Sequence, residues 1–210
     1  MTGKLSRSNS VTKRVVFFGA AQVGKSAIIR HFTKKSFPAH YQPTVEDMYD
    51  CDVEYKGMSV RLDILDTAGS YVFPAMRRLA LNSGDLFVVV YSSDNRQSYL
   101  EALRTCAEIT EVRGHDVPIV VVANKTDLTE QTVLRPEAEL MFCQWNTFTT
   151  ECSAADEWLV NRVFDKCLSL MLPCSEYPLE LLSSPQPARS GVVKAVWLQL
   201  RQSLKKCHLS

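Results

Sequence analysis

Eight consecutive residues near the N-terminus have the types and spacing that hold phosphate groups. Gly19-Ala20-Ala21-Gln22-Val23-Gly24-Lys25-Ser26 fits the pattern G-x-x-x-x-G-K-[ST], between an apolar run and a helical pattern. In that setting, backbone N–H groups of the loop and of the helix N-terminus surround phosphate oxygens. Lys25 then reaches the β- and γ-phosphates, and Ser26 reaches magnesium. The predicted contacts are Gly19, Ala21, Gln22, Val23, Gly24, Lys25, Ser26 and Ala27.

A second motif supplies a candidate for the metal. Asp66-Thr67-Ala68-Gly69 follows an apolar run that ends at Leu65, and an Asp at the carboxyl end of a strand suits magnesium, usually through water. The N–H of Gly69 can approach a γ-phosphate, although Asp-Thr-Ala-Gly is also an ordinary turn sequence. The predicted Mg²⁺ ligands are Ser26, Thr44 and Asp66.

A third motif indicates which base accompanies the phosphates. Asn124-Lys125-Thr126-Asp127 follows another apolar run, and the Asp127 carboxylate can accept hydrogen bonds from the N1 and N2 donors of guanine. Adenine offers no such pair of donors. The segment Cys152-Ser153-Ala154 would present a backbone N–H to the guanine oxygen, and Phe37 would lie against the base or ribose. The predicted contacts in this part are Phe37, Tyr41, Thr44, Asn124, Lys125, Asp127, Ser153 and Ala154.

The elements that must position these motifs alternate between strand and helix patterns from Arg14 onward. The predicted strands are 15–18, 52–55, 60–65, 86–91, 117–123 and 147–151, and the predicted helices are 24–35, 96–113, 136–145 and 157–172. The runs 15–18, 86–91 and 117–123 lack alternation, which is typical of parallel strands covered on both faces. We therefore predict a doubly wound α/β fold with a mostly parallel six-stranded sheet, whose ligands bind at the carboxyl ends of the strands.

Composition places limits on the function. Among 210 residues, 24 basic and 23 acidic side chains give a net charge of +1, which argues against a nucleic-acid partner. The seven cysteines are odd in number and lack metal-ligand spacing, as expected for reduced thiols. Neither a signal peptide nor a spanning apolar run is evident. The predicted organisation is a leader (1–12), one domain (13–172), a Pro/Ser-rich linker (173–191) and a basic amphipathic tail (192–210).

The tail carries a pattern for lipid attachment. The chain ends Cys207-His208-Leu209-Ser210, a C-a-a-X sequence whose final Ser favours farnesyl transfer to Cys207. Upstream, apolar residues that include Trp197 recur at helical spacing among basic residues, as in helices that lie in an anionic membrane surface. We therefore expect the protein at the cytoplasmic face of the plasma membrane. A helix packed on the domain and a calmodulin-type target remain alternatives for the tail.

Over residues 13–172 the sequence resembles the Ras family of small GTPases. The matching motifs are Gly19 to Ser26, Tyr41 to Asp47, Asp66 to Gly69, Asn124 to Asp127 and Glu151 to Ala154. The run Gly69-Ser70 with Phe73 to Leu79 is more similar to the Di-Ras and Rhes branch. The resemblance implies a P-loop small GTPase fold that binds GTP or GDP with Mg²⁺. Its implied partners are Ras-type effector domains at Tyr41–Tyr49, exchange factors and GTPase-activating proteins.

Three departures from the family pattern bear on turnover and, for Ala155, on nucleotide affinity. Ras-type enzymes place after Asp-x-x-Gly a glutamine that orients the attacking water, and this chain has Ser70, which Di-Ras proteins share. Ala21 and Gln22 replace phosphate-loop glycines, and Ala155 replaces a lysine that stacks on the base. The resemblance implies GTP hydrolysis by Lys25, Thr44, Gly69 and Ser70, and the departures imply that it is slow, with GTP bound most of the time. An interaction module that never hydrolyses GTP is the alternative. An ATP-using kinase would not need Asn124 to Asp127.

Overall fold

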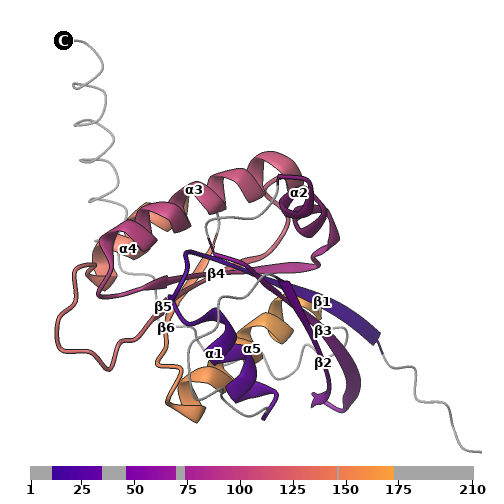
Figure 1. Cartoon of the computed structure of the whole chain (residues 1–210). Coiled ribbons are helices and arrows are strands. Elements are labelled where there is room, and N and C mark those ends of the chain that lie inside the picture. The colour runs from indigo at the N-terminus through magenta and orange to yellow at the C-terminus, as the bar shows by residue number, and fades with distance from the viewer. Residues whose placement is uncertain (1–10, 35–45, 70–73, 146, 173–210) are drawn as a thin grey trace, which may run out of the picture. The chain divides into compact units, whose positions relative to one another are not determined.

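The apolar runs of the sequence form one sheet in the computed structural model, which describes residues 11–34, 46–69, 74–145 and 147–172 (Figure 1). The strands are β1 (Val11–Phe18), β2 (Glu46–Tyr55), β3 (Met58–Thr67), β4 (Leu86–Ser92), β5 (Ile119–Asn124) and β6 (Phe148–Glu151). The helices are α1 (Lys25–Phe32), α2 (Pro74–Ser83), α3 (Arg96–Arg113), α4 (Arg135–Phe142), α5 (Glu157–Met171) and the short 3₁₀ helix η1 (Cys143–Trp145).

The sheet has six strands in the order β2-β3-β1-β4-β5-β6. β1 pairs in parallel with β3 and β4, β4 with β5, and β5 with β6, whereas β2 and β3 are antiparallel. The β2–β3 hairpin turns at Lys56 and Gly57, which both have positive φ angles, and β2 forms one edge of the sheet. The predicted doubly wound, mostly parallel six-stranded fold is confirmed.

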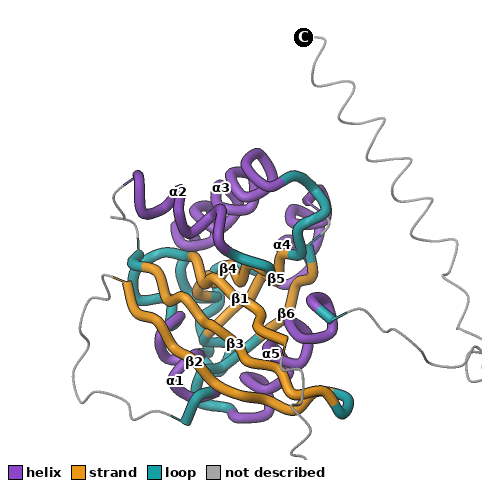
Figure 2. The backbone as a smooth tube through the Cα atoms, turned by 90° about the vertical axis from the view of Figure 1, so that its right-hand side faces the viewer, coloured by secondary structure: helices purple, strands orange, loops and turns teal. Residues whose placement is uncertain are grey.

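Helices cover both faces of the sheet, which explains why the apolar runs do not alternate. Figures 1 and 2 show α1 and α5 on one face and α2, α3 and α4 on the other. Val15 and Phe17 of β1 pack in the core cluster that contains residues of α1 and α5. Val16 and Phe18 pack in the second cluster, with residues of α2, α3 and α4. Successive residues of a central strand are thus buried on opposite faces.

The structure corrects several predicted boundaries. β1 begins at Val11, inside the predicted leader, while β2 and β3 are longer than predicted and α1 ends at Phe32. The predicted helix 136–145 is α4 followed by η1. Helix α2 was not predicted, because only Ala80 and Leu81 of its ten residues are buried and the apolar periodicity is weak.

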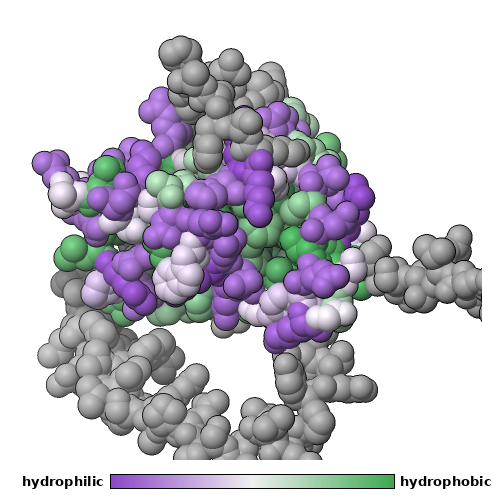
Figure 3. Space-filling view, turned by 90° about the horizontal axis from the view of Figure 1, so that it is seen from below, coloured by the Kyte–Doolittle hydropathy of each residue, from purple (hydrophilic) through white to green (hydrophobic). Residues whose placement is uncertain are grey.

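The surface of the described residues is mixed in character. Figure 3 shows hydrophilic residues interspersed with smaller apolar areas on the face seen from below. Within the part of the chain that the structure describes, no helix combines the length and apolar character needed to cross a membrane.

Candidate functional site

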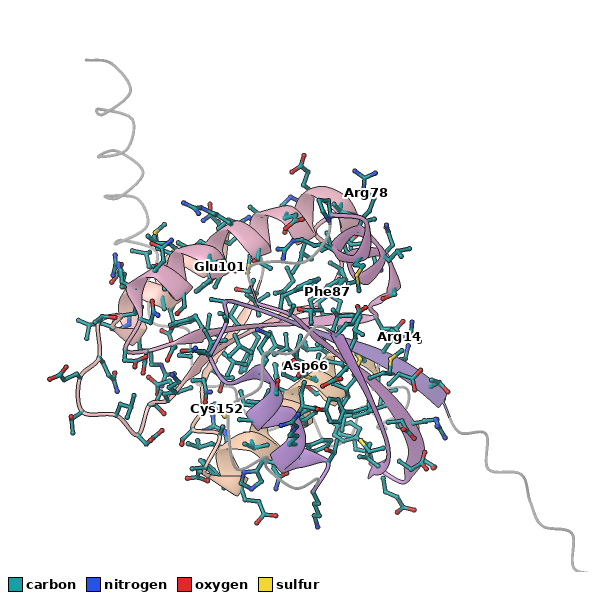
Figure 4. The ribbon with its side chains drawn as sticks, in the orientation of Figure 1. Arg14, Asp66, Arg78, Phe87, Glu101 and Cys152 are labelled. Carbon is teal, nitrogen blue, oxygen red and sulfur yellow. The ribbon has the colours of Figure 1, made fainter. Side chains whose placement is uncertain are left out.

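The phosphate, metal and base motifs meet along the carboxyl edge of the sheet. The phosphate loop runs from the end of β1 into α1, Asp66 lies near the end of β3, and Asn124 is the last residue of β5. Asp66 and Cys152, which are labelled in Figure 4, mark the metal and base parts of this edge. The parallel pairing of β1 with β3 and β4, and of β4 with β5, brings motifs far apart in sequence together.

Lys25 is a buried cation held by the loop that precedes it. Its Nζ donates hydrogen bonds to the carbonyl oxygens of Gly19 and Ala20, at 2.7 and 2.8 Å. Burial lowers the pKa of the Lys25 ammonium to about 8, although attraction to Asp66 and Glu101 acts in the opposite direction. The lysine is therefore pre-positioned at the loop, and a phosphate there would favour its charged form.

Ser26 and Asp66 form the described part of the predicted metal site. The Ser26 hydroxyl donates to Asp66 Oδ2 at 2.5 Å. Asp66 is fully buried, and its Oδ1 has no hydrogen-bond partner among the described residues. Burial raises the pKa of Asp66, while the Ser26 hydrogen bond and the Lys25 charge act to lower it. A buried carboxylate oxygen without a partner, beside a hydroxyl, fits the oxygen ligands that Mg²⁺ prefers.

Two glycines allow the site's loops to approach closely. A Cβ atom built on Gly24, whose φ is +98°, would lie 2.2 Å from Nδ2 of Asn124. A Cβ atom on Gly69 would lie 2.4 Å from the backbone nitrogen of Ala21. Both distances are too short for a real side chain, so these loops require glycine at both positions.

Asn124 ties the phosphate part to the base part. Its Nδ2 donates to the carbonyl oxygen of Val23 at 2.8 Å, and its Oδ1 accepts from the backbone N–H of Ala154 at 3.1 Å. The side chain is 1% exposed. These contacts make Asn124 a cross-link between two loops of the protein, a role that sequence reasoning did not assign, and its predicted contact with the nucleotide stays a prediction.

Two of the predicted base contacts, Asp127 and Ser153, line an open pocket. Its walls are formed by Thr126, Asp127, Ser153, Ala155, Asp156 and Leu159. Asp127 is exposed there, which leaves its carboxylate accessible to a ligand. Thr126 donates to the carbonyl oxygen of Cys152 through both its backbone N–H and its hydroxyl, at 3.2 and 3.1 Å. These bonds hold the base motif against the end of β6.

Sequence reasoning missed other residues that support the site. The Ser93 hydroxyl donates to the carbonyl oxygen of Lys125 at 3.1 Å, and Lys125 has a positive φ of 62°. The Thr67 hydroxyl donates to the carbonyl oxygen of Phe17 at 2.7 Å, joining β3 to β1. No local pattern marks Ser93 for this role, because the contact depends on how the β4 and β5 ends align.

Several predicted residues lie outside the described ranges. These are Phe37, Tyr41, Thr44, Ser70 and Cys207. Their assigned contacts with base, metal, attacking water and lipid therefore stay predictions. Ala27 lies half-buried on α1, and Gln22 is exposed with a positive φ of 63°.

Comparison with known proteins decides the family. The Ras family model matches residues 14–172. This chain belongs to the Ras family. It is 37% identical to Di-Ras1 of Mus musculus over 159 residues, which cover 75% of this chain and 80% of the relative. It is 40% identical to Rhes of Homo sapiens over 139 residues, which cover 61% and 52% of the two chains. It is therefore a Ras-family small GTPase of the Di-Ras and Rhes branch.

In this Ras-family protein the described part of the predicted effector segment is an edge strand. Glu46, Asp47 and Met48 of β2 are exposed. Tyr49 is 6% exposed, and its hydroxyl accepts a hydrogen bond from Arg30 Nε of α1 at 3.1 Å. The edge strand is thus anchored to the helix that carries Lys25 and Ser26, while its polar N-terminal residues face solvent.

Proposed function

We propose that this chain is a signalling switch that binds GTP or GDP with Mg²⁺ and hydrolyses GTP slowly. The observation that carries the proposal is the pairing of the half-buried Ser26 hydroxyl with the fully buried Asp66 carboxylate, beside the buried Lys25. A buried carboxylate and a buried ammonium are unfavourable without partners. A polyphosphate bound with a divalent cation provides a partner of opposite charge for each.

The chain's own residues divide the work of binding. Lys25 neutralises phosphate charge, the loop amides from Gly19 to Ser26 donate to phosphate oxygens, and Asp127 selects guanine through its exposed carboxylate. Magnesium, when bound, supplies positive charge that offsets the negative charge of the phosphates. Thr44 completes the set of protein oxygens proposed to hold it.

Slow hydrolysis follows from the side chains proposed to face the γ-phosphate. A serine at position 70 is too short to hold the attacking water where a glutamine amide would. Gly69 approaches Ala21 so closely that an added Cβ would meet the Ala21 Cα at 2.5 Å and its Cβ at 2.7 Å. We propose that the Ala21 methyl group also takes up space where a partner's arginine would enter. Both features favour a long-lived GTP-bound state.

Single-turnover hydrolysis of bound GTP tests this proposal. We expect slow but measurable hydrolysis in the wild type, faster hydrolysis in Ser70→Gln, and still faster hydrolysis when Ala21→Gly is added. Acceleration by an arginine-finger partner, about 10³–10⁵-fold in favourable systems, should be poor in the wild type.

Ser169→Gln, an exposed change on α5, is the matched control. A wild-type rate equal to that of a glutamine-bearing relative would contradict slow turnover. Complete inactivity in all variants would instead support the non-hydrolysing module.

We propose effector domains as partners at Tyr41–Tyr49, alongside exchange factors and GTPase-activating proteins. An edge strand offers unpaired backbone groups to which a partner can add a strand, and its exposed acidic residues suit a basic partner. Glu46→Lys should weaken binding of a Ras-binding domain to the GTP-loaded protein. Glu54→Lys, at the far end of the same strand, should leave it unchanged, and equal losses would place the contact elsewhere.

We propose attachment to the cytoplasmic face of the plasma membrane through farnesyl transfer to Cys207. One lipid chain binds only reversibly, and the basic residues upstream supply the second signal. Cys207→Ser should move the protein from membranes to cytosol. Replacing Lys205 and Lys206 by Gln should weaken attachment, more so as salt rises. If the Cys207→Ser protein still pellets with membranes as the wild type does, the lipid assignment is wrong.

A further inference from the structure

We infer that His31 is a positioning residue for the base, which sets the place of the loop Ser153–Ala155 by holding the carbonyl group of Ala154. The amides of this loop are the predicted donors to the 6-oxo group of guanine. The inference rests on the proposed guanine specificity and adds a residue that no sequence motif contains. It is carried by a hydrogen bond between α1 and the loop.

The contact joins two segments that are far apart in sequence. His31 Nδ1 lies 2.7 Å from the carbonyl oxygen of Ala154, 123 residues away. A carbonyl oxygen only accepts hydrogen bonds, so Nδ1 must carry the hydrogen. Both residues are half-buried, which reduces competition from water. His31 lies in the last turn of α1.

Other bonds hold the two ends of the loop. The Cys152 N–H donates to the carbonyl oxygen of Ala123 at 2.8 Å, which continues the β5–β6 pairing. The Asp156 carboxylate caps α5 by accepting from the N–H groups of Trp158 and Leu159, at 2.9 and 3.2 Å. Between these ends, Ala154 is held on its N–H side by Asn124 and on its carbonyl side by His31. Loss of His31 would leave the carbonyl group of Ala154, close to the proposed base contact, without this hydrogen bond.

Helix α1 is a firm support for this contact. Ile28 and Ile29 are fully buried, and the Phe32 ring stacks on Phe164 of α5 with centroids 3.6 Å apart and planes at 7°. The same helix begins at Lys25, the proposed phosphate ligand. One rigid helix therefore fixes the distance between the phosphate end and the base end of the site.

The side chain at position 155 does not hold the loop against α1. Ala155 is exposed and has only a methyl side chain, so it cannot cover the base or reach α1. Its N–H donates to the Ser153 hydroxyl at 3.3 Å, a bond within the loop. Apart from apolar packing of Ala154 against the core cluster, the hydrogen bond from His31 sets the place of the loop relative to α1.

Base analogues distinguish this positioning role from helix packing. Dissociation rates would be measured for GDP, for inosine diphosphate, which keeps the 6-oxo group, and for 2-aminopurine riboside diphosphate, which lacks it. The variants are His31→Ala, His31→Asn and His31→Gln, because the Asn amide nitrogen falls near the place of Nδ1 and the Gln amide nitrogen near that of Nε2. His115→Ala is the control, since His115 is exposed before the opposite end of β5.

We expect His31→Ala to release GDP and inosine diphosphate roughly three- to tenfold faster, the effect of one lost hydrogen bond. Release of the 2-aminopurine nucleotide should stay within about twofold of the wild type. His31→Asn should release each nucleotide at the wild-type rate, and His31→Gln should release each at the rate of His31→Ala. Equal acceleration of all three nucleotides, or none, would overturn the inference. If His31→Ala does not fold, equal rates in the Asn and Gln variants overturn it. A wild type without preference for GDP over ADP would instead overturn the proposed function.

Discussion

The phosphate part and the base part of the site are stabilised in different ways. The phosphate part places two buried charged groups, Lys25 at the start of α1 and Asp66 in β3, at one edge of the sheet. Burial lowers the pKa of Lys25 and raises that of Asp66, so it favours the neutral form of each. The base part is held by neutral hydrogen bonds between side chains and backbone, such as those of Thr126 with Cys152. Asp127, whose carboxylate is predicted to recognise guanine, is exposed.

This difference separates affinity from specificity. The phosphate part, with its buried charges, depends on a ligand of opposite charge for electrostatic balance. Changes in the phosphate part should therefore alter the affinity for phosphates and metal. The base part is held by hydrogen bonds within the protein and needs no ligand to form them. Changes at its exposed carboxylate, Asp127, should therefore alter which base is bound. Asn124 belongs to both parts, and changing it should affect the stability of the fold.

The largest effect is expected at Asp127. Asp127→Asn replaces a carboxylate that accepts two hydrogen bonds by an amide, and binding of GTP should weaken about a thousandfold, because bonds to charged groups are each worth ~1.5–3 kcal/mol. Binding of XTP should improve, since xanthine has a carbonyl group at its 2-position. Competition binding with GTP and XTP measures this. Asp116→Asn, an exposed change beyond the other end of β5, should change neither affinity. Unchanged guanine preference in Asp127→Asn would remove Asp127 from the site.

The next effect concerns stability. Asn124→Ala removes both hydrogen bonds of the cross-link and leaves the carbonyl of Val23 and the N–H of Ala154 without them. The free energy of unfolding should fall by ~2–4 kcal/mol, the sum for two poorly solvated groups. Urea unfolding without nucleotide measures it. Asn82→Ala, whose side-chain bond is exposed, should cost far less, and equal losses would show that Asn124 does not join the two parts.

A smaller effect separates the two nucleotides. Ser26→Asn removes the hydroxyl that donates to Asp66 and should weaken GTP roughly tenfold more than GDP, because the γ-phosphate depends on the metal. Titration of both nucleotides at several Mg²⁺ concentrations measures this. Ser26→Thr keeps the hydroxyl and should retain the wild-type ratio. Equal losses of GTP and GDP in Ser26→Asn would argue against the metal role.

The sequence predicted the fold and the edge of the sheet at which the motifs lie, because both depend on local patterns. Unbroken apolar runs such as 86–91 can only be buried strands or helix segments, and the turn-forming motifs after them point to the carboxyl edge of the sheet. The role of Asn124 was not predictable in this way, since it is fixed by contacts with Val23 and Ala154, 101 and 30 residues away. His31 lies outside every motif, and its contact exists only because α1 packs beside α5.

The smallest effect is expected in the reactivity of Cys152, which lies between the base part and the core. Burial, with a further contribution from Asp156, raises the pKa of the Cys152 thiol to about 12. The thiolate is the reactive form and increases with pH through the pKa, so at pH 8 only about one Cys152 in ten thousand is ionised. Cys143 is exposed and should react with iodoacetamide much faster, as measured by mass spectrometry of its peptide.

Adding GDP should change Cys152 labelling by less than about twofold, because the hydrogen bonds that hold the base part are already formed without ligand. Cys167, which is buried and whose pKa is also raised, provides a control far from the nucleotide. Fast labelling of Cys152 that GDP suppresses, with Cys167 unchanged, would mean that the base part opens locally when empty. The base part would then depend on its ligand as the phosphate part does, and the contrast between them would not hold.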